Sequence, residues 1–322
     1  MDSRLAALGR WLHARFPDET FTLSPASEDA SFRRYWRASF AGGRSYVAMD
    51  APPEKEDCRP YLHVAAEFAG AGVHVPRIHA QDLEQGFLLL EDLGDATYLQ
   101  RLSAASAREL YGAAIESLIR IQLASRPNVL PDYDRGLLGR EMRLFPDWYL
   151  ARKRRREPSP GQARVLEAAF AAILENNLAQ PKVFVHRDYH SRNLMVCEPL
   201  PGVLDFQDAV YGPITYDLVS LFRDAYIAWE EEQVLDWVVR YWEKARKAGL
   251  PVRADFAEFY RDFEWMGAQR QIKVVGIFAR LAHRDGKARY LEDIPRALGY
   301  LRAACARYRE LDGLARLLEE LA

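Results

Sequence analysis

The sequence predicts an α+β protein of two lobes, with a small antiparallel β-sheet and one helix preceding a larger, mainly helical part. Runs rich in aromatic and β-branched residues, separated by turn signals, occupy much of residues 21–93. From Tyr98 onward, long stretches place apolar residues at helical spacing instead. The segment EDLGD, Glu91 to Asp95, lies where one pattern gives way to the other. We therefore expect an N-terminal lobe over residues 1–91, a hinge over 92–95 and a C-terminal lobe over 96–322.

The N-terminal lobe should begin with an amphipathic helix over residues 2–16, because Leu8, Leu12 and neighbouring apolar residues recur at helical spacing before Pro17. The glycine pair in AGGR favours a hairpin, so the strands around it belong to an antiparallel meander. A polar turn, DLEQG, separates the last two apolar runs. The expected elements after the first helix are strands 21–26, 31–40 and 45–52, a helix over 60–71, and strands 75–81 and 86–93.

The C-terminal lobe is expected to be helical except over residues 183–208. There the short runs VFVH, NLMVC and GVLDF have the composition of strands. A cleft between two unequal lobes is the usual place for a small-molecule site, so we expect one there. The expected helices cover residues 106–124, 140–151, 160–178, 216–248, 254–280 and 295–320.

Composition narrows the class of protein. With 49% hydrophobic residues, the 322-residue chain can fill a sizeable core, so disorder is not expected. The 44 Lys plus Arg nearly balance the 46 Asp plus Glu, which gives no general reason to expect nucleic acid or an anionic membrane as a partner. The basic run ARKRRRE, 151–157, is more typical of a solvated helix end than of a nucleic-acid site.

The termini and the cysteines suggest an intracellular setting. The first residues lack a charged leader followed by an apolar core, and no later run is long enough to span a bilayer. We therefore expect a cytoplasmic protein with no membrane partner, acting as a monomer. Three cysteines, Cys58, Cys197 and Cys305, are far apart and outside any CxxC pair, so neither a disulfide framework nor a zinc site is indicated.

One motif carries the chemistry. HRDYHSRNL, His186 to Leu194, places an Asp and an Asn on one loop, and LDFQD places Asp205 at the end of a following strand. Carboxylate and amide oxygens suit Mg²⁺, which substrate phosphates usually help to coordinate. A further carboxylate beside them can accept a proton from an attacking hydroxyl. The alternative is that Asp188 and Asn193 only cap turns, which explains each residue singly but explains the set poorly.

This pattern, HxDxxxxN followed by a hydrophobic-Asp pair, resembles the aminoglycoside phosphotransferase and choline kinase group, which are relatives of the protein kinases. The resemblance implies a bilobal protein-kinase-like fold and an enzyme that uses ATP and Mg²⁺. It implies that Asp188 is the catalytic base and that Asn193 and Asp205 are Mg²⁺ ligands. The family's IDxxD spacing also matches Leu204, Asp205 and Asp208.

The same resemblance implies roles for several other residues. The backbone from Glu91 to Leu93 would pair with adenine, and His186 would pack the catalytic loop. Asp217 would brace that loop through backbone N–H groups. The alternative for Asp217 is an acidic residue favoured near a helix N-terminus, and both interpretations stay open.

The sequence departs from the kinase pattern in the N-terminal lobe. The third strand reads SYVAMD, so Met49 and Asp50 stand where a phosphate-binding Lys is expected. Either the protein is a catalytically silent nucleotide-binding module, or another cation reaches the phosphates. We favour a replacement by arginine and name Arg33 and Arg34 as nucleotide-binding residues, with Arg37 on the same strand. The loop ASEDASFRRY lacks glycine, and Ser31 would offer its backbone N–H and hydroxyl to phosphate.

Motifs along the whole chain narrow the resemblance. ASFRRYWR, VAMDAPPE, LLLEDLGD, LDFQDAVYGPITYDL and QRQIKVVGIFARL resemble the bacterial cell-wall amino-sugar kinases that phosphorylate N-acetylmuramate and N-acetylglucosamine at the anomeric hydroxyl. The resemblance implies a sugar 1-phosphate product in peptidoglycan recycling. An aminoglycoside- or choline-type acceptor remains the alternative. Candidate acceptor contacts are Asp208, Trp265, Arg270 and Lys273, although the last three also fit the core and solvated faces of one helix.

Overall fold

The computed structural model describes residues 2–27 and 32–320 of the chain. Its contacts divide the chain into two compact units. Unit 1 comprises Met1–Ala96 and Met195–Asp208, and unit 2 comprises Thr97–Leu194 and Ala209–Ala322. The first unit holds an antiparallel sheet and the second is mainly helical, so the predicted α+β class is confirmed.

The sheet of unit 1 has five strands in the order β1-β2-β3-β5-β4, and every neighbouring pair is antiparallel. The predicted meander and the predicted second hairpin are both present, and β5 joins them by pairing with β3. Gly42 and Gly43 make the tight connection between β2 and β3 at positive φ, which glycine adopts without steric cost. The strands are β1 (Phe21–Ser27), β2 (Arg34–Phe40), β3 (Ser45–Asp50), β4 (Ile78–Asp82) and β5 (Phe87–Glu91).

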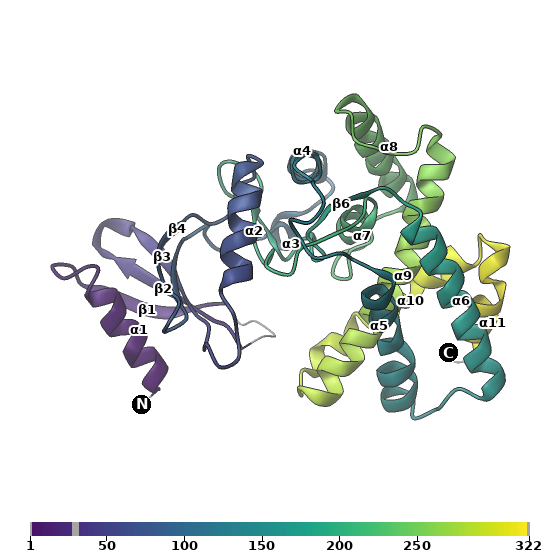
Figure 1. Cartoon of the computed structure of the whole chain (residues 1–322), viewed down its shortest axis with the longest axis horizontal. Helices are drawn as coiled ribbons and strands as arrows, with labels where there is room; N and C mark the ends of the chain where they lie inside the picture. Colours follow the sequence, from purple (N-terminus) through teal and green to yellow (C-terminus); the bar gives the residue numbers. More distant parts are fainter. Residues whose placement is uncertain (1, 28–31, 321–322) are drawn as a thin grey trace. The chain divides into compact units, whose positions relative to one another are not determined.

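Helix α1 (Ser3–His13) packs on one face of this sheet (Figure 1). Asp2 caps its N-terminus by accepting hydrogen bonds from the backbone N–H groups of Arg4 and Leu5. Because strand side chains alternate between faces, every second residue of β2 and β3 meets the helix. The resulting core contains Leu8, Trp11, Leu12, Ala38, Phe40, Ala48, Phe87 and Leu89.

The segment Met195–Asp208 belongs to unit 1, whereas the sequence had placed it in the C-terminal lobe. Backbone pairing explains the difference, since the Val203 N–H donates to the His74 carbonyl at 2.8 Å. Phe206 then packs against Tyr61 of helix α2 (Arg59–Gly70), with ring centroids 4.8 Å apart. Gly202 allows this close approach, because a Cβ there would lie 2.8 Å from Leu93 Cδ1.

Unit 2 is built mainly from helices, with one short strand pair of its own. Strand β6 (Lys182–Val185) pairs with β9 (Val210–Pro213). The sequence predicted a strand at β6 but none at β9. β7 (Leu194–Met195) pairs with β8 (Gly202–Val203) where the chain passes between the units. The helices are α3 (Tyr98–Arg101), α4 (Ala107–Leu123), α5 (Arg135–Leu144), α6 (Pro160–Leu178), α7 (Tyr216–Phe222), α8 (Glu231–Lys247), α9 (Phe256–Arg284), α10 (Ile294–Cys305) and α11 (Asp312–Glu320).

Three predicted helices are interrupted, and the one expected over 295–320 divides into α10 and α11. The helix expected over 216–248 divides into α7 and α8, because Asp224 lies between them and accepts hydrogen bonds from the backbone N–H groups of Ser191 and Tyr226. The helix expected over 140–151 changes into a π-helix, Phe145–Lys153, at Pro146, which has no N–H to continue the α-helical ladder. A tertiary hydrogen bond therefore interrupts one periodic pattern, and a local proline alters another.

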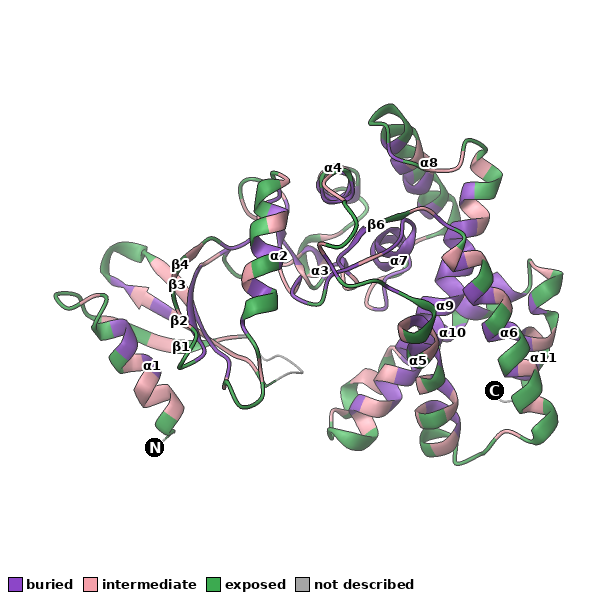
Figure 2. Cartoon of the chain, viewed as in Figure 1, coloured by how far each residue is buried: buried purple, intermediate pink, exposed green. Residues whose placement is uncertain are grey.

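Helix α9 is the central element of unit 2 and is buried along most of its length, as the colouring in Figure 2 shows. Gly276 lets it approach the end of α5, since a Cβ on Gly276 would lie 2.6 Å from the Phe145 nitrogen. Burial extends to its polar residues, including Gln269, Arg270 and Lys273. Within the described part of the chain, none of the helices has the length and apolar character needed to cross a bilayer.

Candidate active site

The loop after β6 carries Asp188 and is tied by its own hydrogen bonds. The Asp188 N–H donates to His186 Nδ1 at 3.2 Å, so the buried imidazole supports the backbone of the loop. The His190 N–H donates to the Asp188 carbonyl at 3.0 Å, and the Asn193 N–H donates to the His190 carbonyl at 2.9 Å. Arg187 adopts φ +78°, a conformation that costs a non-glycine residue about 1 kcal/mol or more. The loop is therefore held in one shape.

Asp217, near the start of α7, holds the backbone of this loop through its carboxylate. Its two carboxylate oxygens accept hydrogen bonds from the His186 N–H at 2.6 Å and the Arg187 N–H at 2.9 Å. Burial raises the pKa of Asp217 to about 7, and the nearby charge of Asp188 acts in the same direction. The two backbone donors oppose this shift.

Replacing Asp217 with Asn should remove a pH dependence of stability. Because folding raises the pKa of Asp217, its stabilising contribution is complete below pH 3.8 and is lost as the pH rises through about 7. We expect the melting temperature of the wild type to fall relative to that of Asp217→Asn between about pH 4 and pH 7, and the difference to stay constant above that range. Thermal unfolding of both proteins across this range checks the prediction, and parallel curves would contradict it.

Asp188 is partly exposed and lies among cations. Burial by itself would raise its pKa, but the charges of Lys273, His190 and Arg270 more than offset burial and lower the pKa to about 2. The carboxylate is consequently ionised at neutral pH. An ionised carboxylate held on a rigid loop can accept a proton from a hydroxyl placed beside it.

A buried ionic network lies next to Asp188, and the sequence did not reveal its centre, Glu141 of α5. Glu141 pairs with Arg187 at 2.6 Å and with Lys273 at 3.0 Å, and it accepts a hydrogen bond from Tyr133. Burial opposes ionisation of Glu141, but the two cations and this hydrogen bond keep its pKa below the usual range. No local motif marks Glu141, because its partners are 46 and 132 positions away in the sequence.

Asn193 presents a defined amide. Its Nδ2 donates to the Asp188 carbonyl at 3.0 Å, which leaves the amide oxygen as the atom that can coordinate a cation. The same hydrogen bond links the two motif residues of the loop. Asn193 is thus a positioned oxygen donor within unit 2.

In unit 1, Asp205 follows β8 and also adopts a left-handed backbone, at φ +60°. Gln207 Nε2 donates to its Oδ1 at 2.7 Å and orients the carboxylate. Phe206, which is fully buried, anchors the turn between them. Asp208 is exposed, and its charge acts on Arg33.

The three arginines named for phosphate binding have different surroundings. Arg33 pairs with Glu56 at 3.2 Å. Burial by itself would lower the pKa of its guanidinium, but the nearby Tyr35, Glu56 and Asp208 raise it. Trp36, Ala38 and Phe40 of β2 face α1. Because side chains alternate along a strand, Arg33, just before β2, faces the opposite side of the sheet. Glu56, just before α2, was not singled out from the sequence.

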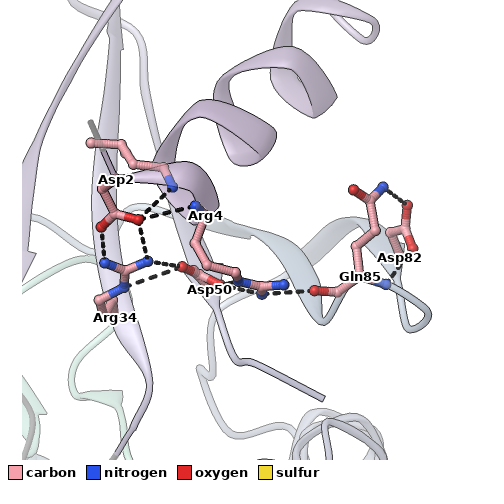
Figure 3. Close-up of polar contacts among 7 residues, drawn as sticks. Asp2, Arg4, Arg34, Asp50, Asp82 and Gln85 are labelled. Atoms are coloured by element: carbon pink, nitrogen blue, oxygen red, sulfur yellow. Dashed lines mark hydrogen bonds and ion pairs between the residues drawn. The ribbon is translucent and has the colours of Figure 1, made fainter. Parts of the chain in front are cut away.

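Arg34 points to the other face, toward α1 (Figure 3). It pairs with the fully buried Asp50 at 2.6 Å and with Asp2, and Arg4 of α1 also binds Asp50. Two arginines therefore neutralise the carboxylate that stands near the expected Lys position. This arrangement fastens α1 to the sheet. Met49 beside it is buried.

Arg37 holds the predicted hinge. It pairs with Asp92 at 2.6 Å and with Asp95, and its guanidinium donates to the Gly94 carbonyl at 3.2 Å. The Glu91 N–H donates to the Arg77 carbonyl at 2.8 Å. Leu93 is 7% exposed.

The candidate acceptor residues on α9 separate into two groups. Trp265 is buried against Tyr308, with ring centroids 5.6 Å apart, and Arg261 stacks on its ring. Lys273 and Arg270 lie on another face, where their charges act on Asp188. Lys273 Nζ also donates to the Tyr216 hydroxyl at 2.8 Å. Ser31, named for the phosphate loop, lies outside the described residues.

Comparison with known proteins places these features in a family. A profile of the phosphotransferase enzyme family, APH, matches residues 22–256. The N-acetylmuramate/N-acetylglucosamine kinase of Neisseria meningitidis is 52% identical over 322 residues, covering 99% of this chain and 96% of that protein. The protein of the same name from Pseudomonas aeruginosa is 51% identical, covering 99% and 97%. One from Caulobacter vibrioides is 34% identical and covers 85% of each.

Solved structures agree on the fold. An ADP-bound aminoglycoside phosphotransferase, APH(2'')-Ib, has a TM-score of 0.61 at 13% identity, covering 93% of this chain and 98% of that one. The ethanolamine kinase of Plasmodium vivax has a TM-score of 0.63 at 11% identity, covering 94% and 87%. At such low identity these matches establish a kinase-like fold only. Together with the family profile and the close relatives, they show that the chain is a phosphotransferase and belongs to the phosphotransferase enzyme family.

Proposed function

We propose that this enzyme uses ATP and Mg²⁺ to phosphorylate the anomeric hydroxyl of N-acetylmuramate and N-acetylglucosamine, giving sugar 1-phosphates for peptidoglycan recycling. The observation that carries this proposal is the 52% identity, over almost the full length of both chains, to a protein named for these two sugars. Because ATP and recycled sugars meet in the cytoplasm, we place the enzyme there. We also propose that it acts as a monomer.

The reaction follows from the position and charge of Asp188. The anomeric oxygen forms a bond to the γ-phosphorus while the bond from that phosphorus to the β,γ-bridging oxygen breaks, and ADP leaves with the electron pair. The proton of the sugar hydroxyl passes to the Asp188 carboxylate, which is ionised before the reaction because its pKa is about 2. Asp217 and His186 keep the Asp188 backbone in place. Positioning by this loop supplies much of the rate enhancement.

The chemistry of Asn193 and Asp205 fits Mg²⁺. An amide oxygen and a carboxylate are hard donors, and a magnesium site usually takes its remaining ligands from water and substrate phosphates. The Asn193 amide is oriented by its bond to the Asp188 carbonyl, and the Asp205 carboxylate is oriented by Gln207. Assigning both residues to one ion rests on the order of the motif in the sequence. Bound Mg²⁺ would neutralise charge on the transferred phosphoryl group.

For the nucleotide, the surroundings favour Arg33 over Arg34 as the cation that replaces the missing Lys. Arg33 lies on the sheet face opposite α1, and the charge of Asp208, three residues after Asp205, acts on its guanidinium. Its pairing with Glu56 is comparable to the Lys–Glu pair of other kinases. The hinge backbone from Glu91 to Leu93 and the Ser31 loop complete the proposed ATP site.

Arg33→Met should raise the KM for ATP about 10- to 100-fold, because one charged contact with phosphate is removed. Arg34→Met, one residue along, is the matched control. It should leave the KM for ATP unchanged but lower the melting temperature, because among the described residues the buried Asp50 keeps only Arg4 as an ion-pair partner. Steady-state kinetics and thermal unfolding of both variants decide the matter. A larger KM effect from Arg34→Met would reverse the assignment.

The proposed activity is tested by incubating the enzyme with ATP, Mg²⁺ and each of several acceptors. Phosphorus NMR of the product should show phosphate on the anomeric carbon of both N-acetylhexosamines. Turnover of choline or an aminoglycoside, with none of the two sugars, would reject the proposed acceptor and leave the family intact. Nucleotide binding without turnover of any acceptor would instead indicate a silent binding module.

A further inference from the structure

Arg270 is a buried cation whose hydrogen-bonding capacity is largely unused. It is 3% exposed and lies on α9, three residues before Lys273. Its Nε and Nη1 are buried and donate to no group in the part of the chain that the structure describes. Leaving donors of a buried charged group unpaired costs about 1–3 kcal/mol or more, so a group with this environment indicates a missing partner.

The location of Arg270 narrows what that partner is. Its charge acts on Asp188, on Asp217 and on His190, so it lies within electrostatic range of the proposed general base, and Lys273 one helical turn away on α9 pairs with Glu141 of the same network. His190 is also nine-tenths buried, and its Nδ1 has no partner among the described residues. Two unsatisfied buried groups therefore occur around the same carboxylate.

Apart from Asp188, on whose carboxylate its charge acts, the acidic groups of this region are engaged by other partners, which leaves the Arg270 guanidinium able to pair with an anionic ligand. Glu141 neutralises Arg187 and Lys273 through direct ion pairs at 2.6 Å and 3.0 Å. Asp224 is occupied by the backbone N–H groups of Ser191 and Tyr226. Arg270 makes no ion pair of its own within the described residues. A polycationic acceptor would meet repulsion here, whereas a carboxylate would meet a planar guanidinium suited to bidentate pairing.

We propose that Arg270, with His190 beside it, recognises the carboxylate of an acidic N-acetylhexosamine acceptor. This inference rests on the proposed function and specifies its acceptor site. N-acetylmuramate carries a lactyl carboxylate two ring carbons from its anomeric carbon, and N-acetylglucosamine lacks that group. A comparison of the two sugars therefore distinguishes recognition of the carboxylate from the steps that both reactions share. Lys273, already paired with Glu141 and Tyr216, positions the network.

The test compares kcat/KM for the two sugars in the wild type, Arg270→Met, Arg270→Lys and the control Arg261→Met. Arg261 lies on the same helix but pairs with Glu310 at 2.8 Å and stacks on Trp265. Arg270→Met should lose about 10- to 100-fold with N-acetylmuramate and less than about threefold with N-acetylglucosamine. Arg270→Lys should recover part of the loss, and Arg261→Met should behave like the wild type toward both sugars.

Equal losses with both sugars would overturn the proposal, because Arg270 would then act on a part of the reaction that they share, such as the transferred phosphoryl group. An undiminished rate with N-acetylmuramate would also overturn it. If the wild type turns over neither sugar, the proposed function itself fails, which is a distinct result.

Removing the charge from the ligand provides a test that does not depend on the folding of a variant. The methyl ester of N-acetylmuramate should react about 10- to 100-fold less efficiently than the acid with the wild type. In Arg270→Met the acid and the ester should be nearly equivalent, because the interacting pair is already broken. Equal efficiency of acid and ester in the wild type would refute recognition of the carboxylate.

Discussion

Asp188→Asn should lower kcat about 1,000-fold with either sugar, since a positioned general base typically contributes between 100- and 10,000-fold. The amide fits the same space but cannot take the proton of the anomeric hydroxyl. The loop should keep its shape, because its supporting bonds involve the Asp188 backbone and the side chains of His186 and Asp217. The KM for ATP should therefore change little. Single-turnover kinetics with radiolabelled ATP measures the chemical step directly.

Asp236→Asn is the matched control for this substitution. Asp236 is an exposed carboxylate of α8 that pairs with Arg240 one helical turn away. Such surface pairs contribute at most about 1 kcal/mol, so the control should keep full activity. If Asp188→Asn retained more than about a tenth of the wild-type kcat, a general-base role would be untenable.

Gly276→Ala should cause a large loss of stability in unit 2. An added Cβ would lie 2.4 Å from the Leu144 carbonyl carbon and 2.6 Å from the Phe145 nitrogen. Both atoms belong to the backbone, so a side-chain rotation cannot relieve the overlap. Overpacking of this kind costs about 3 kcal/mol at the upper end of its usual range. The melting temperature should fall by about 6–12 °C for a unit of this size.

Gly299→Ala tests the same chemical change where there is space. Gly299 is exposed on α10, and a Cβ there would meet no atom within 4 Å. Alanine is favoured over glycine in a helix by about 1 kcal/mol, so this variant should melt about 2–4 °C higher than the wild type. Thermal unfolding followed by circular dichroism compares the two. Equal shifts in one direction would refute the packing argument at Gly276.

Local pattern predicted most elements of the fold but not their interruptions. The meander and the amphipathic first helix follow from alternating and helical periodicity, which depend on neighbours in sequence. The break between α7 and α8 depends on Asp224 receiving the N–H of Ser191, 33 positions away. Strand β9 was missed because it has four residues and includes Gly212 and Pro213. The first of these features depends on a partner that no local window contains, whereas the second carries too weak a local signal.

The candidate site was likewise predictable only in part from the sequence. Asp188, Asn193 and Asp205 were identified because their order and spacing match a known motif. The environment of these residues was not predictable, since Glu141, Glu56 and Asp224 lie on distant segments without a motif of their own. The surroundings also separate two residues that the sequence treated alike. Arg33 pairs with Glu56 beside Asp208, whereas Arg34 neutralises Asp50 on the α1 side.

Because the stretch Met195–Asp208 packs with the N-terminal strands, the chain crosses between the units three times, after residues 96, 194 and 208. A chimaera that exchanged only the first 96 residues with a relative would separate this stretch from the strands and helix that it evolved to fit. Recombination between homologues should therefore succeed only when both pieces of unit 1 come from the same parent. The aspartate at position 205 would be inherited together with the rest of unit 1.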